Sequence, residues 1–504
     1  MAVVSTAVPS GAAASVLGQE FKYVNLREGL AGLPQMIGIF ATFDPLKTAV
    51  VADVPVRVFT EVEAGEKFGF GFPAHLAVRQ VLRKSGIVPV YVFPIDETGT
   101  EADGNILVAG TATSSGTISL YVGGQKISVV VPNGTLPAAT AGLMIAAINA
   151  AINLPATALV NATPEQLDIT AKYKGAISDD ILLNVNLTEA EKDATPGGVT
   201  FTVTALSSGA GVASITNALA QMGDDWYTYI VNTFGTDTDI MDDFVTENED
   251  NKWDTLVNHF FRAFYGSVDD LATITAITDA RTLDRTNGAI TSPGGYMLPL
   301  ELAALGVGNM ASRNQNNPPQ PYTGLLMDGL LPSFEITGSD GAPQWTYPQR
   351  NSAIEAGCST TIVEDGVIKL EDIVMHYHRA GEDPPAYRWA VDIAKLAEWA
   401  YNVDLVFKGD NWRGKILVDD TDIVNNPDAR RPRDATAEIF KLADGASFAA
   451  IITKPGTTKE NTATSIDVAN PNRLNITTLI VLSGASRILS LTTNFGFNFG
   501  ALAE

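Results

Sequence analysis

The segment AHLAVRQVLRKSGIVPVYVF, residues 74–93, sets the fold class of this chain. Its apolar residues first recur at helical spacing, which predicts a helix over 74–85. Apart from Pro89, residues 88–93 are β-branched or aromatic and predict a strand, as do the runs at 35–40 and 56–59. A helix that alternates with strands favours an α/β fold.

The composition changes after residue 105. Between 106 and 206, Val, Thr, Ser and Gly dominate and long charged side chains are few, whereas the preceding 96–105 breaks the earlier pattern. We expect a β-rich, sandwich-like domain inserted into the α/β one. Its predicted strands are 116–122, 125–131, 166–171 and 198–204, with a hairpin turn at Gly123 and Gly124 and a helix at 138–152.

The alternation of helices and strands resumes at 214–233. The acidic segment 237–254 predicts a solvated helix face, and a helix-rich stretch follows to residue 311. Further expected elements are strands near 359–363 and 366–375, a long helix at 387–407 and a strand at 473–482. The second half of that last strand is apolar on both faces, which predicts a central position in a sheet.

The two ends of the chain differ from its middle. Residues 1–19 are small and uncharged and contain Pro9 and Gly11, which predicts an extended arm. Residues 489–499, LSLTTNFGFNF, alternate apolar and polar side chains as a half-buried strand does. Such an edge promotes aggregation when it is left open. It is paired either within its own domain or by a neighbouring subunit, and the alternation leaves both readings open.

Composition excludes several classes of protein. The net charge of −24 disfavours contact with nucleic acid, which needs clustered Lys and Arg. No apolar run is long enough to span a bilayer, and the first residues have no charged n-region, so we expect a soluble cytoplasmic protein. The single cysteine, Cys358, has no partner for an internal disulfide and is expected to be buried and inert.

The chemical inventory is sparse, with four histidines in the whole chain. His376 and His378 would share one face of a strand, as metal ligands must, but a third ligand is missing and a partly exposed strand face is the preferred interpretation. No metal or other cofactor is expected.

Two glycine motifs resemble nucleotide loops. The first, from Gly409 to Lys415, lacks the hydroxyl residue after the lysine and is interpreted as a turn. The second, 69–74, follows an acidic loop rather than a strand, and Pro73 is explained as a helix start. The Gly-x-Ser-x-Gly motif of hydrolases does not occur, so we expect no enzyme.

Short segments along the chain resemble the contractile-tail sheath family, most closely that of Mu-like bacteriophages. They are VPS (8–10), FKY (21–23), KFGFG (67–71), GTISLYVGGQ (116–125), AINAAINLP (147–155), LDITAKYKG (167–175), DWYTYIV (225–231), GCSTTIV (357–363), DGVIKL (365–370) and NPNRLN (470–475). The region of His376 and His378 and the loop around Trp412 and Gly414 depart from the family's pattern.

The resemblance implies a structural subunit of a virion tail, assembled in the bacterial cytoplasm. Subunits would form stacked hexameric rings around a tail tube, meet baseplate and tail terminator proteins, and contract without a nucleotide. Terminal arms would reach into neighbouring subunits through Val3, Val4 and Val8 at one end and Leu489, Leu491, Phe495, Phe497 and Phe499 at the other.

The expected domains are an N-terminal linking arm (1–20), a discontinuous α/β domain (21–104 with 214–345), an inserted outward-facing β-rich domain (105–213), a C-terminal α/β sheath core domain (346–487) and a C-terminal strand arm (488–504). On the helix 387–407, Asp392 and Glu398 are expected to be exposed and to contact the tube.

Two other functions are considered. An adhesin would bind through the β-rich insert, although few aromatic residues occur there. A hydrolase would use acids such as Asp224, Asp225 and Glu382, for which helix capping and loop positions are the simpler explanation.

Overall fold

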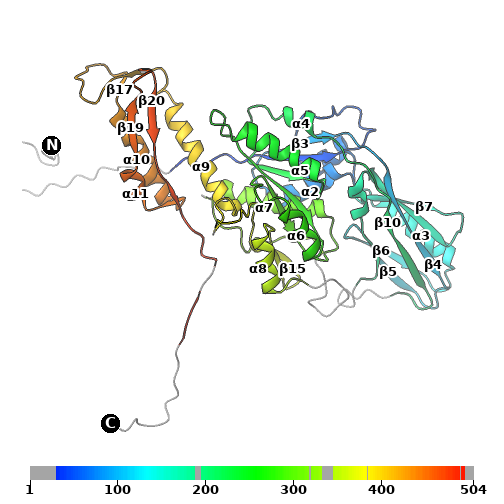
Figure 1. Cartoon of the computed structure of the whole chain (residues 1–504). Helices are drawn as coiled ribbons and strands as arrows, with labels where there is room; N and C mark the ends of the chain where they lie inside the picture. Colours follow the sequence, from blue (N-terminus) through cyan, green and yellow to red (C-terminus); the bar gives the residue numbers. More distant parts are fainter. Residues whose placement is uncertain are drawn as a thin grey trace, which may run out of the picture. The chain divides into compact units, whose positions relative to one another are not determined.

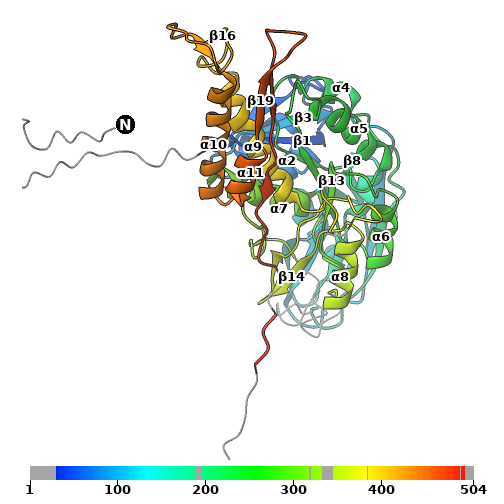
Figure 2. The same ribbon diagram turned by 60° about the vertical axis from the view of Figure 1, so that its left-hand side comes forward.

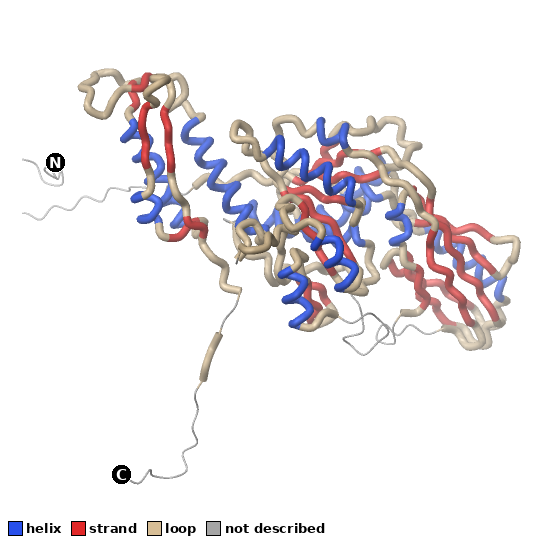
Figure 3. Tube along the Cα trace, viewed as in Figure 1, coloured by secondary structure: helices blue, strands red, loops and turns tan. Residues whose placement is uncertain are grey.

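The computed structural model describes residues 30–187, 195–316, 319–331, 344–382, 384–487 and 490–493 (Figures 1 and 2). The chain divides into two compact units. The larger unit contains Gly32–Tyr401 and Gly484–Glu504, and the smaller unit contains Met1–Ala31 and Asn402–Ser483. Figure 3 distinguishes their helices from their strands.

A six-stranded sheet lies at the centre of the larger unit. In sheet order its strands are β13 (Asn287–Thr291), β12 (Arg262–Ser267), β11 (Tyr229–Asn232), β1 (Ile37–Thr42), β3 (Val90–Ile95) and β2 (Val56–Val58). All neighbours are parallel except β2, which pairs antiparallel with β3 at the edge. Every residue of β1 and β12 is buried, as expected of parallel strands covered on both faces.

Helices cover both faces of this sheet. On one face, α2 (Pro73–Lys84) and α7 (Pro299–Asn316) pack in the same core as Ile37 and Ile39. The opposite face buries Phe40 and Phe93 against α4 (Thr216–Ala220) and α5 (Thr238–Val245). A third cluster includes Cys358 and residues of α6 (Leu271–Asp279) and α8 (Tyr347–Glu355). The predicted α/β fold and the buried thiol are confirmed.

The residues between β3 and α4 build two further sheets. The first contains β10 (Thr200–Ser207), β4 (Glu101–Ala109), β8 (Gln166–Lys174) and β7 (Ala156–Val160), and the second contains β6 (Gln125–Val131), β5 (Gly116–Val122) and β9 (Leu183–Val185). α3 (Pro137–Ala150) and the 3₁₀ helix η1 (Ala176–Asp180) complete this β-rich region. Gly123 and Gly124 form the predicted hairpin turn, with φ of 54° and 77°. At the base of the region, the amide of Thr100 donates to the carbonyl of Ala210 at 2.8 Å.

After α8, the larger unit continues with a hairpin of β14 (Thr361–Glu364) and β15 (Val367–Leu370), which α9 (Ala390–Phe407) follows. α9 begins in the larger unit and its last residues belong to the smaller one.

The smaller unit contains short strands and two helices. They are β16 (Ile416–Leu417), β17 (Ala429–Arg430), α10 (Pro432–Phe448), β18 (Ile452–Thr453), α11 (Pro455–Glu460), β19 (Ala463–Ile466), β20 (Leu474–Thr477) and β21 (Val481–Leu482). Each strand has one partner, and the β19–β20 hairpin packs beside α10 (Figure 2).

Four sequence predictions are corrected. The acidic segment before Gly69 is the helix α1 (Glu61–Phe68), because Thr60 caps it by accepting from the amide of Glu63. The break at 96–105 contains the start of β4, in which buried and exposed residues alternate although the composition is polar. The helix-rich stretch before residue 311 includes β12 and β13, which are short, buried and flanked by helices. The strand at 473–482 is not central: it divides into β20 and β21, in separate two-stranded sheets.

The acidic segment 237–254 is only partly a solvated helix face. α5 continues into the π-helix η2 (Thr246–Lys252), where Asn248 and Lys252 are buried. Asn248 donates to the carbonyl of Phe261 at 3.0 Å and accepts from its amide at 2.8 Å, so this helix binds the start of β12.

Candidate functional site

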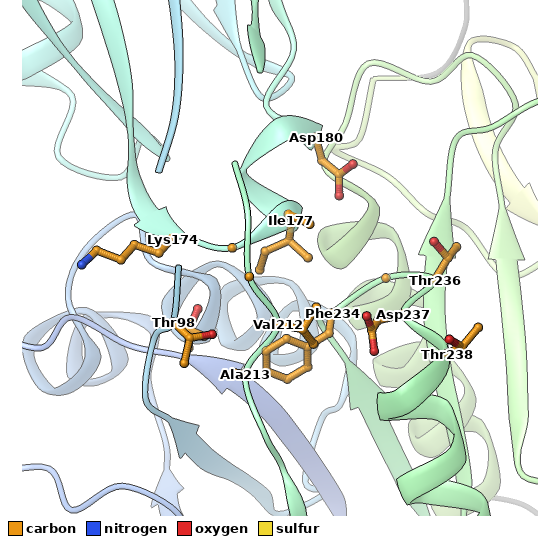
Figure 4. Close-up of a pocket in the computed structure, with 15 residues that line it drawn as sticks. Thr98, Lys174, Ile177, Asp180, Val212, Ala213, Phe234, Thr236, Asp237 and Thr238 are labelled. Carbon is orange, nitrogen blue, oxygen red and sulfur yellow. The ribbon is translucent and has the colours of Figure 1, made fainter. Parts of the chain in front are cut away.

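A cavity of about 360 Å³ lies at the carboxyl ends of the parallel strands (Figure 4). Thr42 ends β1, residues from Phe234 to Thr238 follow β11, and Lys174 to Ile177 come from the β-rich region. The strand order reverses between β1 and β11, where doubly wound sheets place their ligands. Position alone would therefore make this cavity the first candidate for an active site.

The titratable side chains that line this cavity are Lys174, Asp180 and Asp237. Burial, together with the nearby acids Asp269 and Asp179, raises the pKa of Asp180 to about 7. Asp237 caps α5 by accepting from the amide of Ile240 at 3.0 Å. The amino group of Lys174 points away from the other labelled side chains (Figure 4). None of the lining residues is a histidine or a cysteine, so the cavity lacks the most common bases and nucleophiles.

The two candidate metal ligands are held by the backbone instead. His376 is fully buried and its Nδ1 lies 3.0 Å from the carbonyl oxygen of Gly357. His378 Nδ1 lies 2.6 Å from the carbonyl oxygen of His376. Burial lowers the pKa of His376, which keeps the ring neutral. The expected partly exposed strand face is wrong for His376, and within the described ranges no group of three His, Cys, Asp or Glu side chains could hold a metal ion.

The glycine motifs have structural roles, as expected. Pro73 occupies the first turn of α2. After α9 the amides of Trp412 and Arg413 donate to the carbonyl of Gly409, at 3.0 and 2.9 Å, which confirms a turn.

The hydrolase acids have ordinary surroundings. Asp224 and Asp225 are exposed before β11. Glu382 accepts from the hydroxyl of Tyr377 at 3.2 Å. None of this indicates an active site.

The acids of α9 differ from each other. Asp392 is half-buried and pairs with Lys395 at 3.0 Å. Glu398 is only 4% exposed and accepts from the amide of Leu33. The prediction of an exposed acid at 398 is therefore wrong, because amphipathic spacing does not reveal a buried carboxylate that accepts from the backbone.

The predicted interface residues lie almost entirely outside the described part of the chain. This applies to Val3, Val4, Val8, Leu489, Phe495, Phe497 and Phe499. Leu491 is described: it is 81% exposed and belongs to no strand. These subunit contacts stay predictions.

An apolar surface beside β2 was not identified from the sequence. Leu46, Val51, Phe59 and Val62 are all more than half exposed, and a hollow of about 540 Å³ lies between residues 46–56 and α1. Because β2 is an edge strand, this surface adjoins an unpaired sheet edge. The valines at 50–56 are the sequence feature that could have indicated this surface. A buried core strand has the same pattern, so the sequence does not distinguish the two.

No helix in the described part of the chain combines the length and apolarity needed to cross a bilayer.

Comparison with known proteins supplies the remaining evidence. No protein-family model matches the chain. A Mu-like prophage tail sheath protein from Haemophilus influenzae is 26% identical over 431 residues, which cover 84% of this chain and 85% of the relative. Among solved structures, the sheath tail protein of Listeria innocua has a TM-score of 0.48 and 13% identity, covering 91% of this chain and 94% of its own. The sheath tail protein of Desulfitobacterium hafniense has a TM-score of 0.46 and 12% identity, covering 92% and 100%.

The curated relative and this chain match over most of both sequences, rather than in one domain. The resemblance found in the short sequence segments is thereby confirmed: over most of its length, this chain is similar to the tail sheath protein of a Mu-like prophage.

Proposed function

We propose that this protein is the structural subunit of a contractile tail sheath, which polymerises as stacked hexameric rings around a tail tube and contracts to drive the tube through a target envelope. The carrying observation is the match over 84% of this chain and 85% of a Mu-like prophage tail sheath protein. A match over 84% of the chain is longer than the larger unit and so extends into both units, which is why the proposal concerns the chain rather than one module.

The chemistry of the described residues agrees with a structural role. The cavity at the sheet edge contains no activated nucleophile, and His376 and His378 contact backbone carbonyls. The fold instead offers several short strands with one partner each in the smaller unit. Strands of this kind accept further strands from other chains.

In this proposal the ends of the chain are linking arms. Residues 1–20 and 488–504 would reach neighbouring subunits, and Leu489, Leu491, Phe495, Phe497 and Phe499 would form a strand there. Leu491 is 81% exposed among the described residues, which is compatible with cover by another subunit. The β-rich region, 105–213, would be an inserted outward-facing domain. The tube, baseplate and terminator proteins are the proposed partners, and assembly would precede release from the host cytoplasm.

Negative-stain electron microscopy of the purified full-length protein tests this function. Striated tubes or rings of uniform diameter are the expected result, with or without tube protein. Monodisperse particles that form neither, even when tube protein is added, would contradict it.

A further inference from the structure

The N-terminal segment of the larger unit is fastened to α9. The amide of Leu33 donates to the Glu398 carboxylate, at 2.9 Å from Oε2 and 3.1 Å from Oε1. Leu33 and Glu398 are 3% and 4% exposed, so the bond is shielded from water. A buried amide that lost this acceptor would be left without a hydrogen bond, which costs free energy. The bond fixes the chain just before β1 begins.

A similar bond from a side chain of α9 to the N-terminal backbone occurs one turn later, within the smaller unit. Asn402 accepts from the amide of Ala31 at 3.0 Å and donates to the carbonyl of Ala31 at 2.9 Å. A side-chain amide that bonds both backbone groups of one residue imitates the pairing of a β-strand. Two successive turns of α9 therefore bind Leu33 and Ala31, which are two residues apart in the N-terminal segment.

The C-terminal segment is fastened at the start of α9. The guanidinium carbon of Arg487 lies 3.3 Å from the ring centroid of Trp389, the residue before α9. The same guanidinium pairs with Asp372, with 3.3 Å between Nε and Oδ1. Arg487 and Asp372 are largely shielded, at 19% and 22% side-chain exposure, so loss of either one would leave the other charge poorly solvated.

α9 itself is fixed to the sheet. Nη1 of Arg262, in β12, donates to the carbonyl of Ala390 at 3.3 Å and to the hydroxyl of Tyr229 at 3.2 Å. Arg262 is 1% exposed. The amide of Ala390 also donates to the carbonyl of Ile373 at 3.3 Å. The start of the helix is thus bound to the core of the larger unit.

We propose that α9 is the common anchor of the two terminal segments of this chain, holding the N-terminal segment through Glu398 and the C-terminal segment through Trp389 and Arg487. At about 1.5 Å per residue, the two points lie roughly 13 Å apart along one helix. Load applied to either segment is then carried by α9 and, through Arg262, by the central sheet. This inference concerns a single subunit and is tested on unassembled protein, so its failure would leave the proposed sheath function untouched.

The first test is hydrogen exchange at the two fastening points. Glu398→Met removes the acceptor at nearly constant volume, and we expect exchange of the Leu33 amide to rise by about tenfold, as for loss of one buried hydrogen bond. Arg487→Met should raise exchange across 484–487 similarly. Asp404→Asn and Arg473→Met, which alter exposed polar pairs, are the matched controls and should leave both regions unchanged.

The second test measures whether the N-terminal and C-terminal segments keep a fixed distance from each other. Spin labels are placed at Gly32→Cys, where an added Cβ meets no atom within 4 Å, and at the exposed Ser486→Cys. Cys358 is fully buried and does not compete for the label. We expect one narrow distance distribution in the labelled parent, broadened by Glu398→Met, Arg487→Met or Trp389→Leu.

Two results would overturn the proposal. One is a parent distribution already as broad as those of the variants. The other is Leu33 exchange that is unaffected by Glu398→Met. Should the Met variant fail to fold, Glu398→Gln retains one acceptor and is expected to give intermediate exchange. Unchanged exchange in that folded variant would equally reject the anchor.

Discussion

Strands β1 (IGIFAT) and β20 (LNIT) both carry apolar side chains but lie in opposite environments. β1 lies at the centre of a parallel sheet, with helices on both faces and every residue buried. β20 pairs only with β19, and its residues are half-buried or exposed. The larger unit therefore completes its core with its own residues, whereas the smaller unit leaves strands with unused pairing capacity. Apolar patterning indicates that a strand will be covered, but not which chain covers it.

The largest expected effect follows from removing the C-terminal segment. A chain that ends before Leu489 should remain folded and soluble, because the described core lies elsewhere, but should form no sheaths. Electron microscopy of the truncated protein checks this. Normal tubes would reject the proposed arm. They would mean that the strands of the smaller unit need no strand from the C-terminal segment of another subunit.

The second largest expected effect is on folding stability, from shortening a core side chain in β1. Ile39→Ala removes a fully buried side chain and is expected to destabilise the larger unit by about 2–5 kcal/mol. Denaturant dependence of hydrogen exchange in β1 measures this. A loss below about 1 kcal/mol would contradict the closed core assigned to this sheet.

Glu398, in α9, makes the folding stability of the larger unit depend on pH. Burial raises the pKa of Glu398 to about 7, while the bond from Leu33 opposes the shift. Below pH 4.5 both folded and unfolded chains bind the proton, and between about 4.5 and 7 only the folded chain keeps it. Stability attributable to this group is therefore fully present at low pH and lost as pH rises to 7.

The matched variant is Glu398→Gln, which cannot titrate. The difference in unfolding free energy between parent and variant should change by roughly 3 kcal/mol across this pH window, in favour of the variant at higher pH. Chemical unfolding at several pH values measures the difference. A constant difference would mean that Glu398 titrates normally.

The smallest expected effect is in β20. Ile476 is only half-buried, so Ile476→Ala should destabilise unassembled subunits by about 1 kcal/mol or less. Hydrogen exchange of the smaller unit measures it. In assembled sheaths the same substitution should matter more if neighbouring chains cover β20. Equal destabilisation in unassembled subunits and in sheaths would mean that no neighbouring chain covers the β19–β20 hairpin.

The sequence was informative where one chain segment decides its own structure. Strands β5 and β6 were predicted with their observed bounds because alternation and the Gly123–Gly124 turn are local signals. The α/β order and the helix that begins at Pro73 were likewise predictable.

Long-range contacts explain most of what was missed. β12 and β13 are short, and the helices packed on them decide their state rather than their own propensity. Glu398 was expected at the surface because its partner, the amide of Leu33, is 365 residues away. The division of 473–482 into β20 and β21 depends on β19 and β18, which pattern alone does not identify.

The main-chain bridge between Thr100 and Ala210 brings the two ends of the β-rich region together. Its first and last strands, β4 and β10, are also antiparallel neighbours, so the chain enters and leaves at one point. A foreign domain with adjacent termini can be joined there without stretching the central sheet. In an assembled polymer, each subunit would then present one copy of the grafted domain, at a spacing set by the lattice.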